Sequence, residues 1–175
     1  IFRLSSDIFP HYTDEVTGGY SMDFALESLK EAGEAAKRYH QRINMHPGQY
    51  NQVGAKDETV FSHTVADLKM HADILDAMGV DENGIICVHG GGTYGDKRKT
   101  IERWIGNFSR LPENVKRRLC IENCERQYSV LDCLEISEAC NIPVIFDSHH
   151  FECYNSLPRE KIDIHEVLPR ILDSW

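Results

Sequence analysis

Short apolar runs alternate with longer amphipathic stretches along the whole chain. The apolar runs predict strands at residues 2–4, 42–46, 84–89, 118–123 and 143–147. The amphipathic stretches predict helices at residues 21–39, 57–78, 97–108, 129–140 and 162–172. Pro169 is expected to disturb the last helix, because proline lacks the N–H that a helix interior needs. The pattern predicts a parallel α/β sheet built from about five βα units.

Two α/β architectures fit this repetition, a doubly wound sheet and a (β/α)8 TIM barrel. The first predicted strand is not followed by GxGxxG, which lowers the weight of a dinucleotide-binding sheet. The sequence also lacks the phosphate-binding loop of nucleotide triphosphatases, GxxxxGK followed by serine or threonine. The repetition alone leaves both architectures open, with less weight on the dinucleotide-binding version of the doubly wound sheet.

Composition narrows the functional classes. The chain has 175 residues, 41% of them hydrophobic and 27% charged, and a formal net charge of -9. No apolar run approaches the roughly 18–20 residues of a membrane span, so no membrane association is expected. The acidic balance argues against a nucleic-acid binder that works by bulk electrostatics alone.

One basic segment stands out from this acidic background. Lys97, Arg98 and Lys99 follow a run of three glycines after the third predicted strand. They are candidate contacts for the phosphates of DNA. The alternative is that they only form the solvated face of a helix.

The six cysteines include no CxxC pair, and most of them lie in apolar strand or helix patterns. Buried free thiols in a reducing, intracellular compartment are the simplest interpretation. A structural zinc knuckle would need closer cysteine spacing.

Residues that bind metals recur at the ends of four consecutive predicted strands. His46 ends the second strand, His89 the third and Glu122 the fourth, and Asp147 with His150 follows the fifth. A single histidine at a strand end is usually structural, but the carboxyl ends of parallel strands share one rim. Imidazole and carboxylate ligands favour Mn²⁺, Fe²⁺ or Zn²⁺. A cluster of such ions suits phosphodiester hydrolysis.

Gln49 and Tyr50 follow His46 in a tight turn and are expected to protrude near the same rim. They are either ordinary loop residues or a polar and aromatic pair that fills a gap in a base stack.

Several motifs in this order resemble those of the UV damage endonucleases, metal-dependent DNA repair enzymes with a TIM barrel similar to that of apurinic endonuclease four. The motifs are FRLSSDIFP, MHPGQY, VHGGG, IENCER and VIFDSHH, and the similarity runs from Phe2 to about Asn155. The resemblance implies a nick immediately 5′ to pyrimidine dimers, 6-4 photoproducts and some abasic sites in double-stranded DNA. It also implies two or three divalent ions, with Mn²⁺ expected first and Zn²⁺ or Mg²⁺ as alternatives.

The resemblance assigns roles by motif position. Five residues match the metal ligands of the family, namely His46, His89, Glu122, Asp147 and His150. The resemblance implies that these are also the catalytic positions. Gln49 and Tyr50 match the pair that probes the distorted duplex. Asp14 falls where the family usually carries a metal-binding histidine, so it is a further candidate ligand.

The resemblance also implies that residues 1–175 are a partial domain supplying strands two to six of an eight-stranded barrel, without the first and last strands. The intact enzyme is expected to be monomeric and intracellular, in the cytoplasm of a prokaryote or the nucleus of a eukaryote. The segment alone is expected to be inactive or to associate through its open sheet edges. A sugar isomerase or epimerase on the same barrel, with a similar metal site, remains the alternative function.

Overall fold

The computed structural model describes residues 1–14 and 19–175. Its described strands form one 5-stranded parallel sheet in the order β1-β2-β3-β4-β5. These strands are β1 (Phe2–Leu4), β2 (Ile43–Met45), β3 (Ile85–His89), β4 (Leu119–Glu122) and β5 (Val144–Ile145). Each predicted strand is present, and the sequential order is that of adjacent βα units in a barrel wall. The predicted α/β fold class is confirmed.

The helices that connect these strands follow the amphipathic stretches. The principal helices are α1 (Leu26–Arg38), α2 (Glu58–Ala77), α3 (Lys97–Phe108), α5 (Val130–Cys140) and α7 (Ile164–Asp173). Polar side chains fix several of their starts. The Asp57 carboxylate accepts from the first turn of α2, and Ser129 forms a capping box with Asp132 at the start of α5.

The structure differs from the sequence-based prediction in local detail. Residues 22–25 form a 3-10 turn before α1, so the first helix is two elements rather than one. Two short helices were not predicted, α4 (Glu113–Lys116) and α6 (Ser148–Ser156). Pro169 lies inside α7 without ending it. Pro169 is the sixth residue of α7, so its missing N–H costs the helix one hydrogen bond, yet the helix continues to Asp173.

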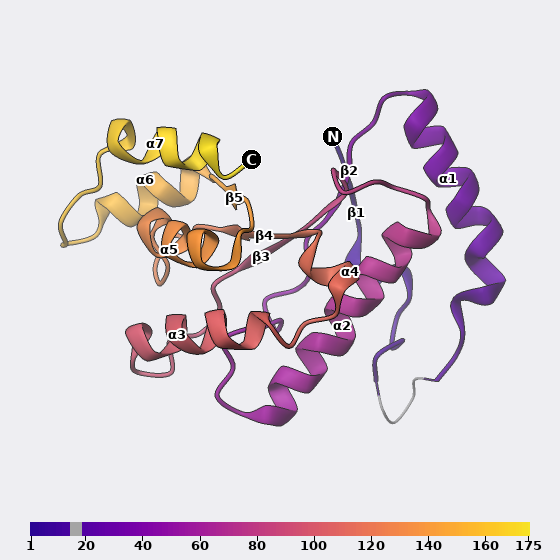
Figure 1. The fold of residues 1–175 in the computed structure, drawn as a ribbon, viewed down its shortest axis with the longest axis horizontal. Helices are drawn as coiled ribbons and strands as arrows, with labels where there is room; N and C mark the ends of the chain where they lie inside the picture. Colours follow the sequence, from indigo (N-terminus) through magenta and orange to yellow (C-terminus); the bar gives the residue numbers. More distant parts are fainter. Residues whose placement is uncertain (15–18) are drawn as a thin grey trace.

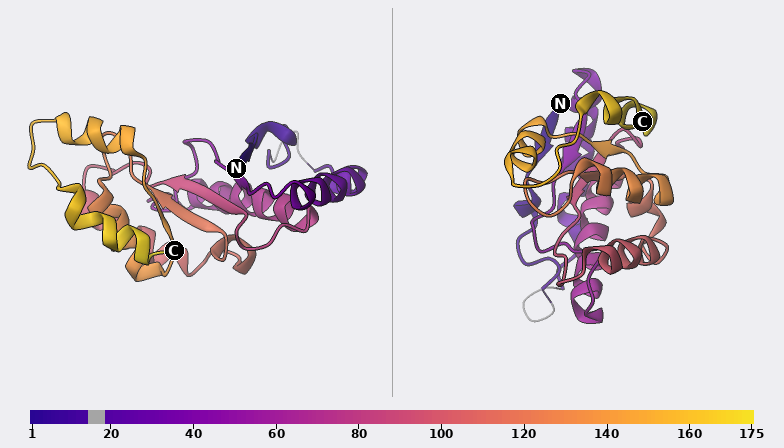
Figure 2. Two further views of the ribbon diagram at one scale, coloured as in Figure 1. Left: turned by 90° about the horizontal axis from the view of Figure 1, so that it is seen from above. Right: turned by 90° about the vertical axis from the view of Figure 1, so that its left-hand side faces the viewer.

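The apolar core lies between the sheet and the helices. Met45, Ile86 and Ile121 on the central strands are fully buried, as are Leu68 and Leu75 of α2. Neighbouring helices pack on one another along the sheet, with contacts between α1 and α2, α3 and α5, and α5 and α7. Figure 1 and Figure 2 show a curved, elongated body with α1 and α2 towards one end and α5, α6 and α7 towards the other.

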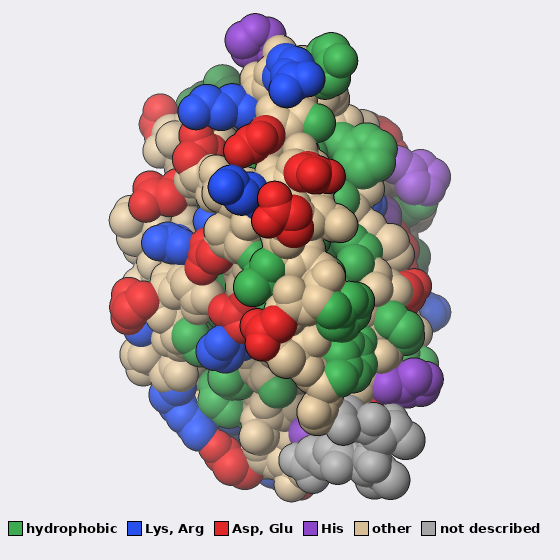
Figure 3. Space-filling view, turned by 90° about the vertical axis from the view of Figure 1, so that its right-hand side faces the viewer, with side chains coloured by type: hydrophobic (Ala, Val, Ile, Leu, Met, Phe, Trp, Pro, Cys, Tyr) green, Lys and Arg blue, Asp and Glu red, His purple; other side chains and the backbone are tan. Residues whose placement is uncertain are grey.

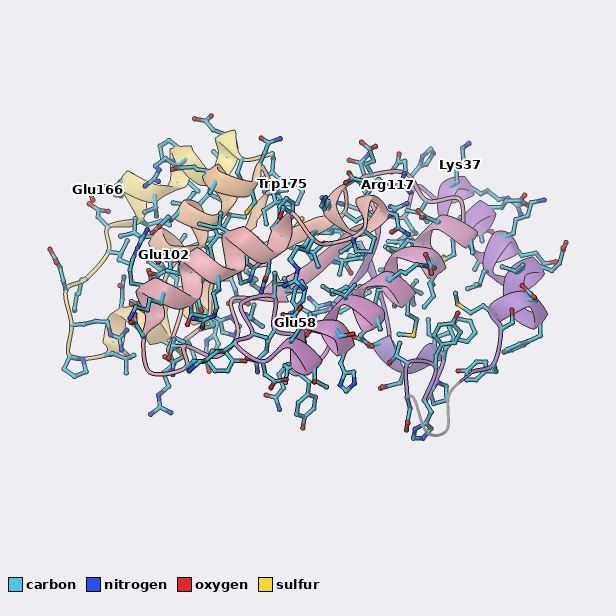
Figure 4. All side chains as sticks on the ribbon, turned by 60° about the horizontal axis from the view of Figure 1, so that its bottom comes forward. Lys37, Glu58, Glu102, Arg117, Glu166 and Trp175 are labelled. Atoms are coloured by element: carbon cyan, nitrogen blue, oxygen red, sulfur yellow. The ribbon has the colours of Figure 1, made fainter. Side chains whose placement is uncertain are left out.

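The outer surface is a mixture of charges. Figure 3 shows acidic and basic side chains interspersed on the side of the molecule near α1, with hydrophobic side chains gathered towards the undescribed residues. Lys37 of α1 and Glu166 of α7 lie at opposite ends of the molecule and point outward in Figure 4. Within the described residues, no helix is both long and apolar enough to cross a membrane.

Candidate metal centre at the carboxyl ends of the strands

The parallel register brings three of the predicted ligands together. His46 directly follows β2, while His89 and Glu122 are the last residues of β3 and β4 and stand opposite each other in the register. His46 Nε2 lies 2.9 Å from Glu122 Oε2, and His89 Nε2 lies 3.4 Å from the same oxygen. The Glu122 carboxylate, at 6% exposure, is therefore the centre of the cluster.

Asp147 and His150 complete this rim from β5 and α6. Asp147 is the N-cap of α6, and its Oδ1 accepts from the backbone N–H of His150 at 2.8 Å. His150 Nδ1 lies 3.9 Å from Asp147 Oδ2 and within hydrogen-bond distance, 3.0 Å, of the Asn123 carbonyl oxygen. The rings of His89 and His150 have their centres 5.4 Å apart, so both parts face one space.

His149 lies beside this site but outside it. Both His149 and His150 lie in α6, where successive side chains rotate by about 100° around the helix axis, so the two neighbouring rings point in different directions. His149 Nε2 instead lies 3.7 Å from the thiol of Cys153, one turn further along α6.

The ligand atoms form two overlapping groups. One contains His46, Cys87 and Glu122, and the other contains Glu122, Asp147 and His150, with the atoms of each group within 4.8 Å of one another. The spacing and the mixed donors fit divalent transition metals. His89 adds a third imidazole beside these groups through Nε2, the ring nitrogen that faces Glu122. The residues present therefore fit a metal centre.

Electrostatics within the cluster support this fit. The hydrogen bond to Glu122 raises the pKa of His46, although partial burial opposes it. Burial lowers the pKa of His89, which keeps its ring neutral and able to bind a metal. Burial works to raise the pKa of Glu122, but hydrogen bonds from His46 and Cys87 outweigh it and the net shift is downward. Glu122 is thus held as a carboxylate, the form that binds cations.

A cavity of about 540 Å³ opens in front of these residues. His46, His89 and His150 line it together with Gln49 and Gln127. Tyr50 belongs instead to a neighbouring cavity of about 690 Å³, where its ring is 81% exposed. The structure therefore places Gln49 at the metal-type cluster and Tyr50 at the adjoining surface.

Asp14 lines this second cavity and is in neither ligand group. Its Oδ2 lies 3.7 Å from His11 Nδ1, and His63 and Asp67 of α2 line the same cavity. The structure thus separates Asp14 from the five predicted ligands, which lie together at the strand ends.

The basic segment lies at the start of α3, against α5. Lys97 Nζ is 2.8 Å from Asp132 Oδ2, and the Arg98 guanidinium pairs with Glu135. Lys99 Nζ is 3.3 Å from Asp96 at the helix N-cap, and its side chain is 74% exposed. Lys97 and Arg98 therefore join two helices, and Lys99 is the most solvent-accessible cation of the three.

Sequence reasoning missed three residues that support the site. Asn123 is buried and bonds to the backbone of Asp147 in both directions. Gln52 Oε1 accepts from the backbone N–H of Gly92 at 3.2 Å, which ties the Gln49 loop to the glycine-rich loop after β3. Cys87 donates from Sγ to Glu122 Oε2 at 3.2 Å. The position of Asn123, next to Glu122, was the only available signal in the sequence.

Comparisons with known proteins identify the family of the chain. The model of the family "UV-endonuclease UvdE" matches residues 1–175. The chain is 36% identical over 99% of its length to the UV-damage endonuclease of Schizosaccharomyces pombe, covering 30% of that protein. It is 35% identical over its full length to the UV DNA damage endonuclease of Clostridium perfringens, covering 42% of it. The chain thus spans about half or less of the length of these curated relatives.

Solved structures give the same result. The crystal structure of SacUVDE matches with a TM-score of 0.89 and 36% identity, covering 99% of this chain and 58% of the other. Endonuclease IV from Thermus thermophilus matches with a TM-score of 0.63 and 16% identity, covering 99% of this chain and 61% of the other, which indicates a shared fold. The fold is that of an α/β protein with TIM-barrel relatives, and its imidazoles and carboxylates cluster at the carboxyl ends of the strands. Within this class, the chain belongs to the UvdE family of UV endonucleases.

Proposed function

We propose that this chain forms part of a metal-dependent DNA repair endonuclease that cuts a phosphodiester 5′ to UV photoproducts, both pyrimidine dimers and 6-4 photoproducts, and to abasic sites. The observation that carries the proposal is the convergence of imidazoles and carboxylates from four strand ends on Glu122. Family membership favours this nuclease over a sugar isomerase on the same barrel. The substrate is damaged double-stranded DNA, and the site of action is inside the cell.

The proposed ligands are His46, His89, Glu122, Asp147 and His150, holding two or three divalent ions, with Mn²⁺ as the first choice. When bound, such ions supply Lewis acidity to the phosphodiester and activate water for attack. Asp14 is proposed as an accessory ligand only, reached from the adjoining cavity.

The chain's own residues position the reaction. Glu122 belongs to both ligand groups, so it fixes their separation. Asn123 is hydrogen-bonded to the backbone of Asp147. This contact holds Asp147 at a fixed position relative to Glu122, the residue that the two ligand groups share. Gln49 lines the cavity at the cluster and Tyr50 is exposed beside it, so both are placed to meet a distorted base stack. Lys97, Arg98 and Lys99 are proposed to contact phosphates, with Lys99 as the most accessible.

The test is nicking of UV-irradiated supercoiled plasmid by the intact protein, with Glu122→Gln as the variant. This change keeps the side-chain shape but removes the charge that holds cations, so nicking is expected to be lost. Glu166→Gln on the exposed surface of α7 is the matched control and should cut at the wild-type rate. Nicking retained by Glu122→Gln would refute the assignment.

A further inference from the structure

Cys87 lies one layer beneath the proposed metal centre. It is two residues before His89 on β3, so both side chains point to the same face of the sheet. The side chain is only 2% exposed, yet its thiol is directed at the carboxylate that the outer ligands share. A buried cysteine that acted only as a small hydrophobic residue would not need this contact.

Cys120 provides the internal comparison. It stands opposite Cys87 in the register between β3 and β4 and is equally buried. Its nearest polar partner is a backbone carbonyl, that of Arg118, at 3.9 Å from its sulfur. The two neighbouring thiols therefore differ in their contacts. Of this pair, only Cys87 lies close enough to His46 and Glu122 to form a possible ligand group with them.

The geometry of this inner group is close to that of a soft-metal site. His46 Nε2 and Cys87 Sγ lie 2.9 Å and 3.2 Å from Glu122 Oε2. Ligand atoms around a tetrahedral Zn²⁺ stand about 3.3–3.6 Å apart, given bonds of about 2.0–2.3 Å. These two contacts are therefore within a few tenths of an ångström of the spacing of zinc ligands, and all three ligand atoms lie within 4.8 Å of one another.

We propose that His46, Cys87 and Glu122 form a second, thiophilic binding mode of the metal centre, an inference that rests on the proposed function of this site. A soft divalent ion such as Zn²⁺ or Cd²⁺ displaces the thiol proton to solvent and binds the resulting thiolate. Mn²⁺ prefers oxygen and nitrogen ligands, so it is held by the imidazoles and carboxylates of the proposed centre and leaves the thiol protonated.

This arrangement has a consequence for activity. Glu122 is a member of both groups, so an ion held by Cys87 competes for the carboxylate that the outer group requires. Soft ions are therefore inhibitors of the Mn²⁺-loaded protein, and Cys87 is the residue that determines this sensitivity.

Cobalt binding tests the ligand directly, because a thiolate bound to Co²⁺ produces a charge-transfer band in the near ultraviolet. The intact protein is freed of metal and titrated with Co²⁺ as wild type, Cys87→Ser and Cys153→Ser. Cys153 is the matched control, because it is another cysteine near an imidazole. The band is expected in wild type and Cys153→Ser and absent from Cys87→Ser. A band retained by Cys87→Ser, or no band in wild type, overturns the proposal.

Serine keeps a hydrogen-bond donor near Glu122, so the variant is expected to fold. If it does not, X-ray absorption of the zinc-loaded Cys153→Ser protein decides, with a sulfur neighbour at about 2.3 Å in support and only nitrogen and oxygen neighbours against.

Inhibition gives the functional measurement. The Zn²⁺ concentration that halves each variant's own Mn²⁺-supported nicking is expected to rise at least about tenfold in Cys87→Ser. An unchanged value overturns the proposal. If wild type does not nick at all, the proposed function fails, while the cobalt band still decides the thiolate mode.

Discussion

Asn123 and Asp147 are joined by two hydrogen bonds across neighbouring strand ends. Asn123 Nδ2 donates to the Asp147 carbonyl oxygen at 3.0 Å, and the Asp147 N–H donates to Asn123 Oδ1 at 2.9 Å. The Asn123 carbonyl in turn accepts from His150. The buried residue Asn123 thus holds Asp147 through its side-chain amide and His150 through its backbone carbonyl, the two residues that the second ligand group takes from the last βα unit.

Replacing Asn123 by alanine should therefore damage metal binding as well as folding. The change leaves the half-buried backbone N–H and carbonyl of Asp147 without their Asn123 partners, which costs about 1–3 kcal/mol. Residues that orient ligands typically change metal affinity by about 10–100-fold, so Mn²⁺ affinity should fall by this amount. Calorimetric titration with Mn²⁺ measures it. Asn123→Asp keeps an acceptor for the Asp147 N–H and should fold better than the alanine variant. Unchanged Mn²⁺ affinity in Asn123→Ala would contradict the orienting role.

The His46–Glu122 pair should give the metal-free protein a characteristic pH dependence. Glu122 raises the pKa of His46 above its ordinary value of 6.5. The protonated His46 therefore stabilises the folded protein fully below pH 6.5, and this contribution is lost as pH rises through the folded pKa. The pKa of Glu122 is lowered from its ordinary value of 4.5 despite burial. The ionised Glu122 therefore stabilises the folded protein fully above pH 4.5, and this contribution is lost as pH falls through the folded pKa. Both contributions are complete between about pH 4.5 and 6.5.

Urea unfolding with a chelator present measures this effect. The difference in unfolding free energy between wild type and His46→Gln should be largest in that window and decrease on either side. A His46→Gln difference that is flat from about pH 4 to 8 would be evidence against the charged pair.

The strand ends could be predicted from the sequence because each lies where an apolar run meets a polar residue. His46, His89 and Glu122 are such residues, and parallel pairing brings them together. The helix α6 could not be predicted, because Ser148–Ser156 has a weak amphipathic pattern and is fixed by the Asp147 cap. The contact between Cys87 and Glu122 depends on side-chain orientation across two strands, which hydrophobic periodicity does not specify.

Gly90 is predicted to be required for stability, because the ring of Tyr128 packs directly against its backbone. A Cβ at this position would lie 2.4 Å from the ring of Tyr128, which is fully buried. Gly90→Ala should therefore destabilise the protein by about 1–3 kcal/mol through overpacking next to His89. Gly106→Ala in α3 is the control, since its Cβ meets no atom within 4 Å, and it should stabilise by about 0.5–1 kcal/mol. Thermal unfolding of both variants tests the prediction, and equal melting temperatures would contradict it.

Lys97 and Lys99 should differ in what they contribute to DNA binding. Lys97 pairs with Asp132 and also reaches the Gln127 carbonyl, so Lys97→Gln should mainly loosen the contact between α3 and α5. Lys99 is exposed and pairs with Asp96 of its own helix N-terminus, in a surface pair of little energetic value. If Lys99 contacts a phosphate, Lys99→Gln should reduce the salt slope of DNA binding by about 1. Fluorescence anisotropy with irradiated duplex over a range of salt concentrations measures this slope. Lys161→Gln, an exposed lysine after α6, is the control, and a Lys99→Gln slope equal to its slope would exclude the phosphate contact.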